Sequence, residues 1–243
     1  MIVLFTDFGL HGPYVGQMKA VLHREAPGVP VVDLFADAPA FDPRAGAYLL
    51  APYVLEFPAG SVFLGVVDPG VGTAGREPVA VEADGRWFVG PGNGLFEVVA
   101  RRADSVRAWT LTWRPERLSA SFHGRDLFAP VAARLARGEA VPGSPRPCPD
   151  PAFDGWPEEL AEVVYCDHYG NALTGLRAAR LSDSAVLEVA GRRLRRARTF
   201  GEVAVGEAFW YENANGLAEV AVNRGRADRD LGIGPGSPVG VSG

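Results

Sequence analysis

The sequence Val66-Val67-Asp68-Pro69-Gly70-Val71-Gly72-Thr73 marks the point where a central strand gives way to a turn. The short, continuous apolar run over residues 61–67 indicates a buried strand. The proline and glycines after Asp68 predict a sharp turn whose backbone can approach a ligand closely. Because open α/β sheets bind ligands at the carboxyl ends of their strands, we expect Asp68 to lie at a ligand site.

The chain before this segment alternates between apolar runs of strand length and stretches with helical spacing. We expect strands over residues 2–5 and 29–35, and helices over residues 13–25 and 42–54. Asp42 is a good N-cap for the second of these helices. Alternation of this kind predicts parallel strands joined by right-handed crossovers.

A hairpin is expected after the Asp68 turn. Residues 79–83 and 87–89 flank Asp84-Gly85, which is a strong hairpin signal. The glycine-rich segment over residues 90–95 follows directly. It either wraps a ligand or a neighbouring chain, or forms a tight connection to a helix over residues 95–101.

The pattern changes along the chain and predicts two domains. Residues 1–140 are expected to form an N-terminal α/β domain, a mostly parallel sheet with flanking helices. The proline-rich stretch over residues 141–157 loses its periodicity and is expected to be a linker. Residues 158–243 consist of short strand patterns separated by glycine turns, which predicts a smaller antiparallel β domain, a barrel or a sandwich.

The composition indicates a globular protein that binds neither nucleic acid nor a membrane. The chain has 243 residues, 47% of them hydrophobic, and a net charge of −5. Its basic cluster over residues 192–198 is expected to be a solvated hairpin or an interface rim. The start of the chain does not resemble a signal peptide, and no apolar run approaches membrane-spanning length, so we expect a cytoplasmic protein. Cys148 and Cys166 are expected to be free thiols.

Several acids and bases could carry chemistry, although each alone has a structural explanation. Asp7, Asp68 and His123 are each expected to follow a strand, so their side chains should converge at one edge of the sheet. A carboxylate, a guanidinium and an imidazole together can orient a water molecule and lower the cost of removing its proton. No metal-binding spacing such as CxxC or HxxxH occurs, so we expect no catalytic metal. The candidates are Asp7, Asp68, Arg76, His123, Arg125, Asp126 and Asp167.

Motifs along nearly the whole chain resemble those of the S-adenosyl-L-methionine hydrolases, a family related to the fluorinase and chlorinase enzymes. They occur in the same order as in that family. The motifs are Thr6-Asp7-Phe8-Gly9, Tyr14-Val15-Gly16-Gln17-Met18-Lys19, Val67-Asp68-Pro69-Gly70-Val71-Gly72-Thr73, Gly92-Asn93-Gly94-Leu95, Phe122-His123-Gly124-Arg125-Asp126-Leu127-Phe128-Ala129-Pro130, Asp167-His168-Tyr169-Gly170-Asn171 and Gly216-Leu217-Ala218-Glu219-Val220-Ala221-Val222-Asn223.

The resemblance implies a reaction and an assembly. Water or hydroxide would attack the C5′ carbon of S-adenosyl-L-methionine and release adenosine and L-methionine, with no cofactor. The protein would be a homotrimer, with the substrate between the N-terminal domain of one subunit and the C-terminal domain of the next. Asp68, Arg76 and His123 would handle the nucleophile, and either Asp68 or His123 would accept its proton.

The resemblance also implies a set of substrate contacts. Asp7 would hold the ribose hydroxyls, and Asp167 and Asn171 would contact the methionine and adenine ends. Asn213 and Asn215 would face the carboxylate of the amino acid. The remaining expected substrate-binding residues are Phe8, Tyr169 and Ala227.

The chain departs from the family pattern after the Asp68 turn. The family usually reads Gly-Thr-x-Arg-Arg there, whereas this chain reads Gly72-Thr73-Ala74-Gly75-Arg76-Glu77, with one extra residue. Arg76 is therefore expected to replace the family's catalytic arginine. A halide would meet Asp68 as a like charge, so we expect hydrolysis. The alternatives are a 5′-halogenase and a non-catalytic protein that binds adenosine or S-adenosyl-L-methionine.

Overall fold

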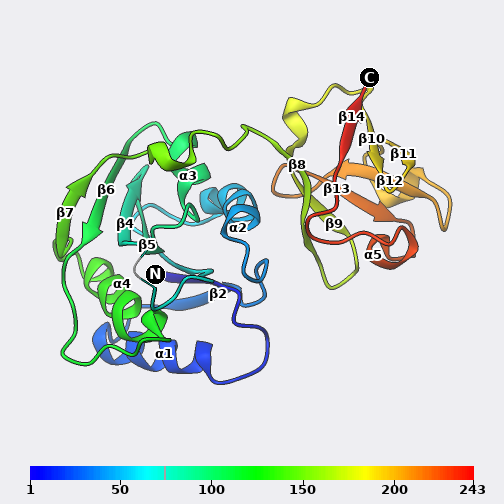
Figure 1. Cartoon of the computed structure of the whole chain (residues 1–243). Helices are drawn as coiled ribbons and strands as arrows, with labels where there is room; N and C mark the ends of the chain where they lie inside the picture. The colour runs from blue at the N-terminus through cyan, green and yellow to red at the C-terminus, as the bar shows by residue number, and fades with distance from the viewer. Residues whose placement is uncertain (74) are drawn as a thin grey trace. The chain divides into compact units, whose positions relative to one another are not determined.

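The computed structural model describes residues 1–73 and 75–243. The chain divides into two compact units (Figure 1). The first unit spans Met1–Gly155 and the second spans Trp156–Gly243. In the described part of the chain, no helix has both the length and the apolar character needed to cross a membrane.

The first unit is built on a mixed seven-stranded sheet with the order β2-β1-β3-β5-β4-β6-β7. Strands β1, β2, β3 and β5 pair in parallel, whereas β4, β6 and β7 join the sheet by antiparallel pairing. The predicted α/β domain is confirmed, and so is the hairpin, which joins β4 to β5. The strands are β1 (Ile2–Thr6), β2 (Val31–Phe35), β3 (Val62–Val66), β4 (Pro78–Ala83), β5 (Arg86–Pro91), β6 (Val106–Leu111) and β7 (Gly143–Arg146).

Helices cover both faces of this sheet. Figure 1 shows α1 and α4 side by side on one face, with α2 and α3 on the other. Asp42 caps α2 as predicted, because its carboxylate accepts a hydrogen bond from the Ala45 N–H at 2.9 Å. The helices are α1 (Tyr14–Glu25), α2 (Pro43–Leu50), η1 (Ala51–Glu56), α3 (Glu97–Arg102), the π-helical turn η2 (Gly124–Phe128) and α4 (Ala129–Ala136).

Strands β1 and β3 are buried throughout because the sheet is covered on both sides. Ile2 and Leu4 face the core that α1 and α4 complete. Phe63 is fully buried and stacks on Phe88 of β5, with ring centroids 4.9 Å apart. The continuous apolar runs that predict these strands therefore reflect burial on both faces of a central pair.

The stretch predicted to be a linker, residues 141–157, differs from that expectation. Residues Gly143–Arg146 form β7, which pairs with β6 at the edge of the sheet, and Pro151–Phe153 form a 3-10 turn, η3. A proline is tolerated in β7 because an edge strand leaves one row of N–H groups without a ladder partner. The boundary between the units falls between Gly155 and Trp156.

The second unit contains two antiparallel sheets that share one core, as the prediction of a small β domain requires. Trp210 is fully buried in this core, and its indole N–H donates to the Ala185 carbonyl at 3.0 Å. One sheet has the order β12-β13-β9-β8 and the other β11-β10-β14. The elements are β8 (Leu160–Cys166), β9 (Ala172–Arg177), η4 (Ala178–Arg180), β10 (Val186–Val189), β11 (Arg192–Arg195), η5 (Phe200–Glu202), β12 (Ala208–Glu212), β13 (Leu217–Val222), α5 (Ala227–Asp230) and β14 (Gly240–Ser242).

Candidate functional site

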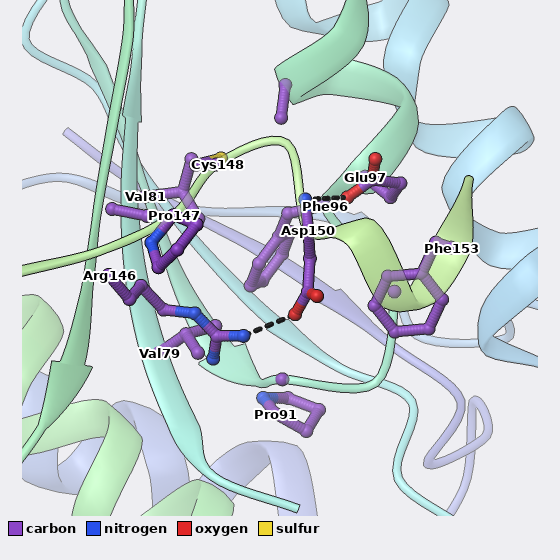
Figure 2. Close-up of a pocket in the computed structure, with 14 residues that line it drawn as sticks. Val79, Val81, Pro91, Phe96, Glu97, Arg146, Pro147, Cys148, Asp150 and Phe153 are labelled. Carbon is purple, nitrogen blue, oxygen red and sulfur yellow. Dashed lines mark hydrogen bonds and ion pairs between the residues drawn. The ribbon is translucent and has the colours of Figure 1, made fainter.

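A cleft of about 650 Å³ opens in the first unit beyond the carboxyl ends of β1 and β3. Five of the residues singled out in the sequence line it, namely Asp7, Phe8, Asp68, His123 and Arg125. Among the described residues, every one that lines this cleft belongs to the first unit. A second hollow near Cys148 has a volume of only about 40 Å³ and mostly apolar walls (Figure 2), so it is too small for a nucleoside.

The two carboxylates reach the cleft because their strands end side by side. Asp7 follows β1 directly, and its N–H donates to the Val66 carbonyl of the neighbouring strand at 3.4 Å. Asp68 comes two residues after the last residue of β3. The Asn93 side-chain amide donates to the Val67 carbonyl at 2.8 Å and so holds the end of this strand in place.

Asp68 forms a buried ion pair with Arg76. The exposed fractions of the two side chains are 4% and 8%. Burial raises the pKa of Asp68, the positive charge of Arg76 opposes this rise, and the negative charge of Asp7 adds to it. Arg76, which the sequence analysis expects to replace the family's catalytic arginine, reaches Asp68. Ala74 in the loop before Arg76 lies outside the described residues.

Arg76 also contacts His123, with 3.1 Å between its Nη2 atom and the Nδ1 atom of the imidazole. A guanidinium can only donate hydrogen bonds, so Nδ1 must be the acceptor and the ring proton belongs on Nε2. Burial lowers the pKa of His123, and the positive charges of Arg76 and Arg114 lower it further, against the opposing charge of Asp126. The imidazole is therefore neutral at pH 7, with Nε2–H as its donor.

His123 does not follow a strand, and that part of the sequence prediction is wrong. The preceding strand, β6, ends at Leu111, and His123 instead directly precedes the π-helical turn η2. Its convergence with Asp68 and Arg76 is nevertheless observed. The sequence does not reveal that a long irregular segment separates β6 from η2, because this segment has no regular pattern.

An aromatic wall flanks the cleft. The rings of Phe8, Tyr14 and Phe122 contact one another in pairs, with centroids 5.5 to 5.9 Å apart. Only Phe8 belongs to the predicted binding set. Tyr14 begins α1, immediately after the loop that leaves β1. That position is the signal that could have identified it, because such loops line the ligand edge of a sheet.

Phe41 is a further residue at the cleft that the sequence analysis does not select. Its backbone has a φ of 61°, and its side chain is 77% exposed. The Phe41 N–H donates to Oδ2 of Asp7 at 3.0 Å. Burial raises the pKa of Asp7, and this hydrogen bond opposes the rise. A bulky residue with positive φ is unusual and is often found at functional sites.

The predicted residues Asp167, Tyr169 and Asn171 lie on the hairpin between β8 and β9 in the second unit. Asp167 accepts hydrogen bonds from the backbone N–H of Asn171 at 2.9 Å and from its side-chain amide at 3.3 Å. Tyr169 is 73% exposed near the end of the hairpin, whereas Asn171 is buried. Ala227, the first residue of α5, is fully buried.

Asn213 is held by its own turn. Its side-chain oxygen accepts hydrogen bonds from the N–H groups of Asn215 and Leu217, each at 3.0 Å. Its amide donates to Glu219 at 2.9 Å, and Glu219 also accepts the Tyr211 hydroxyl at 2.5 Å. These bonds fix the orientation of the Asn213 amide.

Glu219 is a buried carboxylate that bonds to Asn213, and the sequence analysis assigns it no role. It is buried within β13, where burial raises its pKa and hydrogen bonds from Tyr211 and Asn213 oppose the rise. A carboxylate inside the otherwise apolar run of β13 is the signal that could have identified it. The second unit therefore carries its own polar network, built around Glu219.

Among the described residues, no cluster of three or more His, Cys, Asp or Glu side chains could hold a metal ion. Cys148 and Cys166 are both free and half-buried. Burial raises the pKa of each thiol to about 11, so both are protonated at pH 7.

Comparisons with known proteins agree with the motifs. The family model of the SAM hydroxide adenosyltransferase N-terminal domain, SAM being S-adenosyl-L-methionine, matches residues 2–143, and that of the C-terminal domain matches residues 161–240. The chain is 43% identical over 256 aligned positions to the (R)-S-adenosyl-L-methionine hydrolase of Thermus thermophilus, an alignment that covers 98% of each protein.

More distant matches extend this picture. The crystal structure of an uncharacterized conserved protein from Thermotoga maritima has a TM-score of 0.88 to this chain at 30% identity, covering 100% of both. A fluorinase from Nocardia brasiliensis is 26% identical over 164 residues, covering 57% of this chain and 54% of the fluorinase. The matches confirm the resemblance inferred from the motifs.

Proposed function

We propose that this chain, which belongs to the SAM hydroxide adenosyltransferase family, hydrolyses S-adenosyl-L-methionine to adenosine and L-methionine. The observation that carries the proposal is the buried Asp68–Arg76 ion pair together with His123, which lines the cleft. Hydrolysis at a sulfonium centre needs a positioned water and a proton acceptor, and these three side chains supply both roles.

The cleft suits the nucleoside part of this substrate. Its volume of about 650 Å³ lies within the range of small-molecule sites. We assign Phe8, Tyr14 and Phe122 to contact with the adenine ring, because aromatic side chains pack well against flat π-systems. Asp7 would accept hydrogen bonds from the ribose hydroxyls in place of the Phe41 N–H or together with it.

The chemical step is a displacement at C5′. A water oxygen forms a bond to C5′ as the C5′–S bond breaks, the bonding electron pair passes to sulfur, and methionine leaves as a neutral thioether. No acid is needed for this leaving group. The water gives up one proton, and the enzyme must provide the group that accepts it.

Asp68 is our choice for the proton acceptor. Nδ1 of His123 already accepts from Arg76 and Nε2 carries the ring proton, so neither nitrogen is free to act as a base. The raised pKa of Asp68 makes it a stronger base than an exposed carboxylate. His123 would donate from Nε2–H to the attacking oxygen, and Arg76 would hold both side chains in register.

The methionine end is assigned to the second unit, together with the assembly that this requires. We propose a homotrimer, as the family resemblance implies, in which the second unit of a neighbouring subunit completes the site. The residues assigned to this role are Asp167, Tyr169, Asn171, Asn213, Asn215 and Ala227. The free thiols of Cys148 and Cys166 support a cytoplasmic location, and we propose no nucleic-acid or membrane partner.

The decisive experiment is incubation of the purified protein with S-adenosyl-L-methionine, with products separated by chromatography. Formation of equal amounts of adenosine and methionine is expected. A folded protein that binds the substrate without turnover would overturn the proposal in favour of a binding protein. A halogenated nucleoside formed only in the presence of chloride would identify a 5′-halogenase instead.

A further inference from the structure

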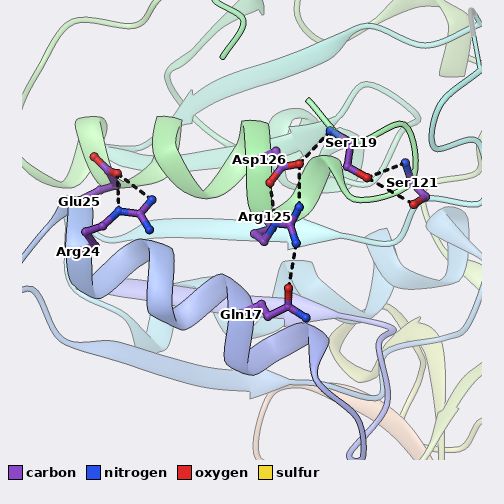
Figure 3. Close-up of polar contacts among 7 residues, drawn as sticks. All are labelled: Gln17, Arg24, Glu25, Ser119, Ser121, Arg125 and Asp126. Atoms are coloured by element: carbon purple, nitrogen blue, oxygen red, sulfur yellow. Dashed lines mark hydrogen bonds and ion pairs between the residues drawn. The ribbon is translucent and has the colours of Figure 1, made fainter. Parts of the chain in front are cut away.

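A polar cluster beside the cleft connects three separate segments of the first unit (Figure 3). Arg125 donates from Nε and Nη2 to the two carboxylate oxygens of Asp126, at 2.6 and 3.0 Å. Its Nη1 atom donates to the Gln17 side-chain oxygen on α1 at 2.9 Å. Asp126 also accepts the Ser119 backbone N–H at 2.9 Å. The cluster thus joins α1, the start of η2 and the irregular segment before it.

Asp126 is the centre of this cluster. Its side chain is 13% exposed, and it receives three hydrogen bonds from two residues. The hydrogen bond from Arg125 lowers the pKa of Asp126, so the carboxylate is ionised at neutral pH. The Arg125 guanidinium also lies over the Phe122 ring, 4.9 Å from its centroid. The side chains of Arg125 and Asp126 are therefore each held in a single conformation.

The cluster holds the backbone in place both before and after His123. Ser119 precedes His123 by four residues in the chain and Arg125 follows it by two, so the segment between them is tied at each end. The same segment packs against the turn that follows Asp68. A Cβ on Gly72 would lie 2.4 Å from the Ala120 carbonyl oxygen, which shows how closely the two backbones approach.

We propose that Asp126 is a positioning residue for the hydrolysis. By holding the Ser119 N–H and the Arg125 fork, it keeps the segment that carries His123 against Arg76, where Nδ1 accepts its 3.1 Å hydrogen bond. Asp126 itself does not line the cleft in the described residues, so it acts through His123. This inference rests on the proposed hydrolase function.

The test is a double-mutant cycle on adenosine release. Asp126→Asn should lower kcat about tenfold and leave KM within about threefold, because the positioning of His123 affects the chemical step more than binding. In a His123→Gln background, the same Asp126→Asn change should alter kcat less than twofold. Arg125→Lys, which keeps the charge but loses the planar fork, should reproduce this pattern if Asp126→Asn does not fold.

Figure 3 also shows the residue pair used for the matched control variant. Arg24 and Glu25 are likewise an adjacent arginine and carboxylate, but they are well exposed at the end of α1. Glu25→Gln should leave kcat unchanged. Equal losses of kcat from Asp126→Asn with and without His123 would overturn the inference, as would a full rate in the single variant. Absence of adenosine from the wild-type protein would instead reject the hydrolase function itself.

Discussion

Asp68 is a buried carboxylate whose nearest cation is also buried, so its removal tests both chemistry and folding. Asp68→Asn keeps the size of the side chain but removes the proton acceptor. We expect kcat to fall about 10²–10⁴-fold. Substrate binding, followed by calorimetry, should persist because Asp7 and the aromatic wall are unchanged.

The control for this variant is its thermal unfolding, because loss of the carboxylate leaves the Arg76 charge buried without its partner. The kinetic comparison should be made at a temperature where the variant is folded. If the folded variant released adenosine at the wild-type rate, Asp68 would not be the base.

The pH dependence of kcat depends on Arg76. The ionised form of Asp68 is the active base, so activity is lost as the pH falls through its pKa. Arg76 opposes the rise in that pKa and also lowers the pKa of His123. Arg76→Gln should therefore raise both pKa values and move the acid side of the kcat profile to higher pH.

The matched control is Arg107→Gln, since Arg107 pairs with Glu82 at an exposed position of the first sheet. Its pH profile should coincide with that of the wild type. A profile for Arg76→Gln that moved to lower pH would contradict the assigned electrostatics.

The sequence predicted the residues at strand ends better than the residues in irregular segments. Asp7 and Asp68 could be placed because an acid directly after a buried apolar run marks the ligand edge of a sheet. His123 was also selected as a residue that follows a strand, and its local structure was predicted wrongly because a π-helical turn has no periodic signature. The roles of Glu219 and Asn213 depend on a hydrogen bond across a hairpin, which spacing alone cannot reveal.

The turn between β3 and β4 and the segment before η2 are built to fit each other. Gly72 has a φ of 78°, and an added Cβ would collide with the Ala120 carbonyl oxygen. Gly72→Ala should lower the free energy of unfolding by about 1–3 kcal/mol more than a glycine replaced without a clash. It should also lower kcat, because the displaced segment carries His123.

Gly28 offers the comparison for this prediction. Its φ is 82°, and an added Cβ would meet no described atom within 4 Å. Gly28→Ala should cost about 1–2 kcal/mol from the left-handed backbone alone, with kcat unchanged. Equal destabilisation of the two variants in denaturant unfolding would mean that the contact with Ala120 can relax.

Strand β13 presents a carboxylate to the turn that precedes it. Glu219→Gln leaves one acceptor oxygen where the carboxylate has two, so the Asn213 amide and the Tyr211 hydroxyl can no longer each donate to an oxygen of their own. We expect the free energy of unfolding to fall by about 1–3 kcal/mol. Glu188→Gln, on the exposed side of β10, should change it by less than about 0.5 kcal/mol. Hydrogen exchange in the second unit would locate the effect.

Strands β6 and β7 are the two strands of the seven-stranded first sheet that were not predicted. Strand β6 mixes arginine, tryptophan and threonine with apolar residues, so it has no continuous apolar run. Strand β7 has the sequence Gly143-Ser144-Pro145-Arg146, which reads as a turn until its partner strand is known. Pairing at the edge of a sheet is a tertiary effect, and local sequence does not encode it.

The division into two units makes the proposed trimer testable without a crystal. Two inactive variants can be mixed, one altered in the first unit at Asp68 and one altered in the second unit at Asn171. If each site takes its two halves from different subunits, random assembly should restore about a quarter of the sites. Mass measurement in solution should give three chains. No recovery of activity after mixing would place both halves in the same chain.

The hydrogen bond between Arg76 and His123 has a consequence for contaminating zinc. Two acids and an imidazole can each offer an electron pair to zinc, although no three such side chains among the described residues are arranged to hold an ion. Here the Nδ1 pair is already taken by the guanidinium, and Nε2 holds a proton. Zinc would have to displace either the Arg76 guanidinium from Nδ1 or the proton from Nε2. We therefore expect that traces of zinc do not inhibit the enzyme.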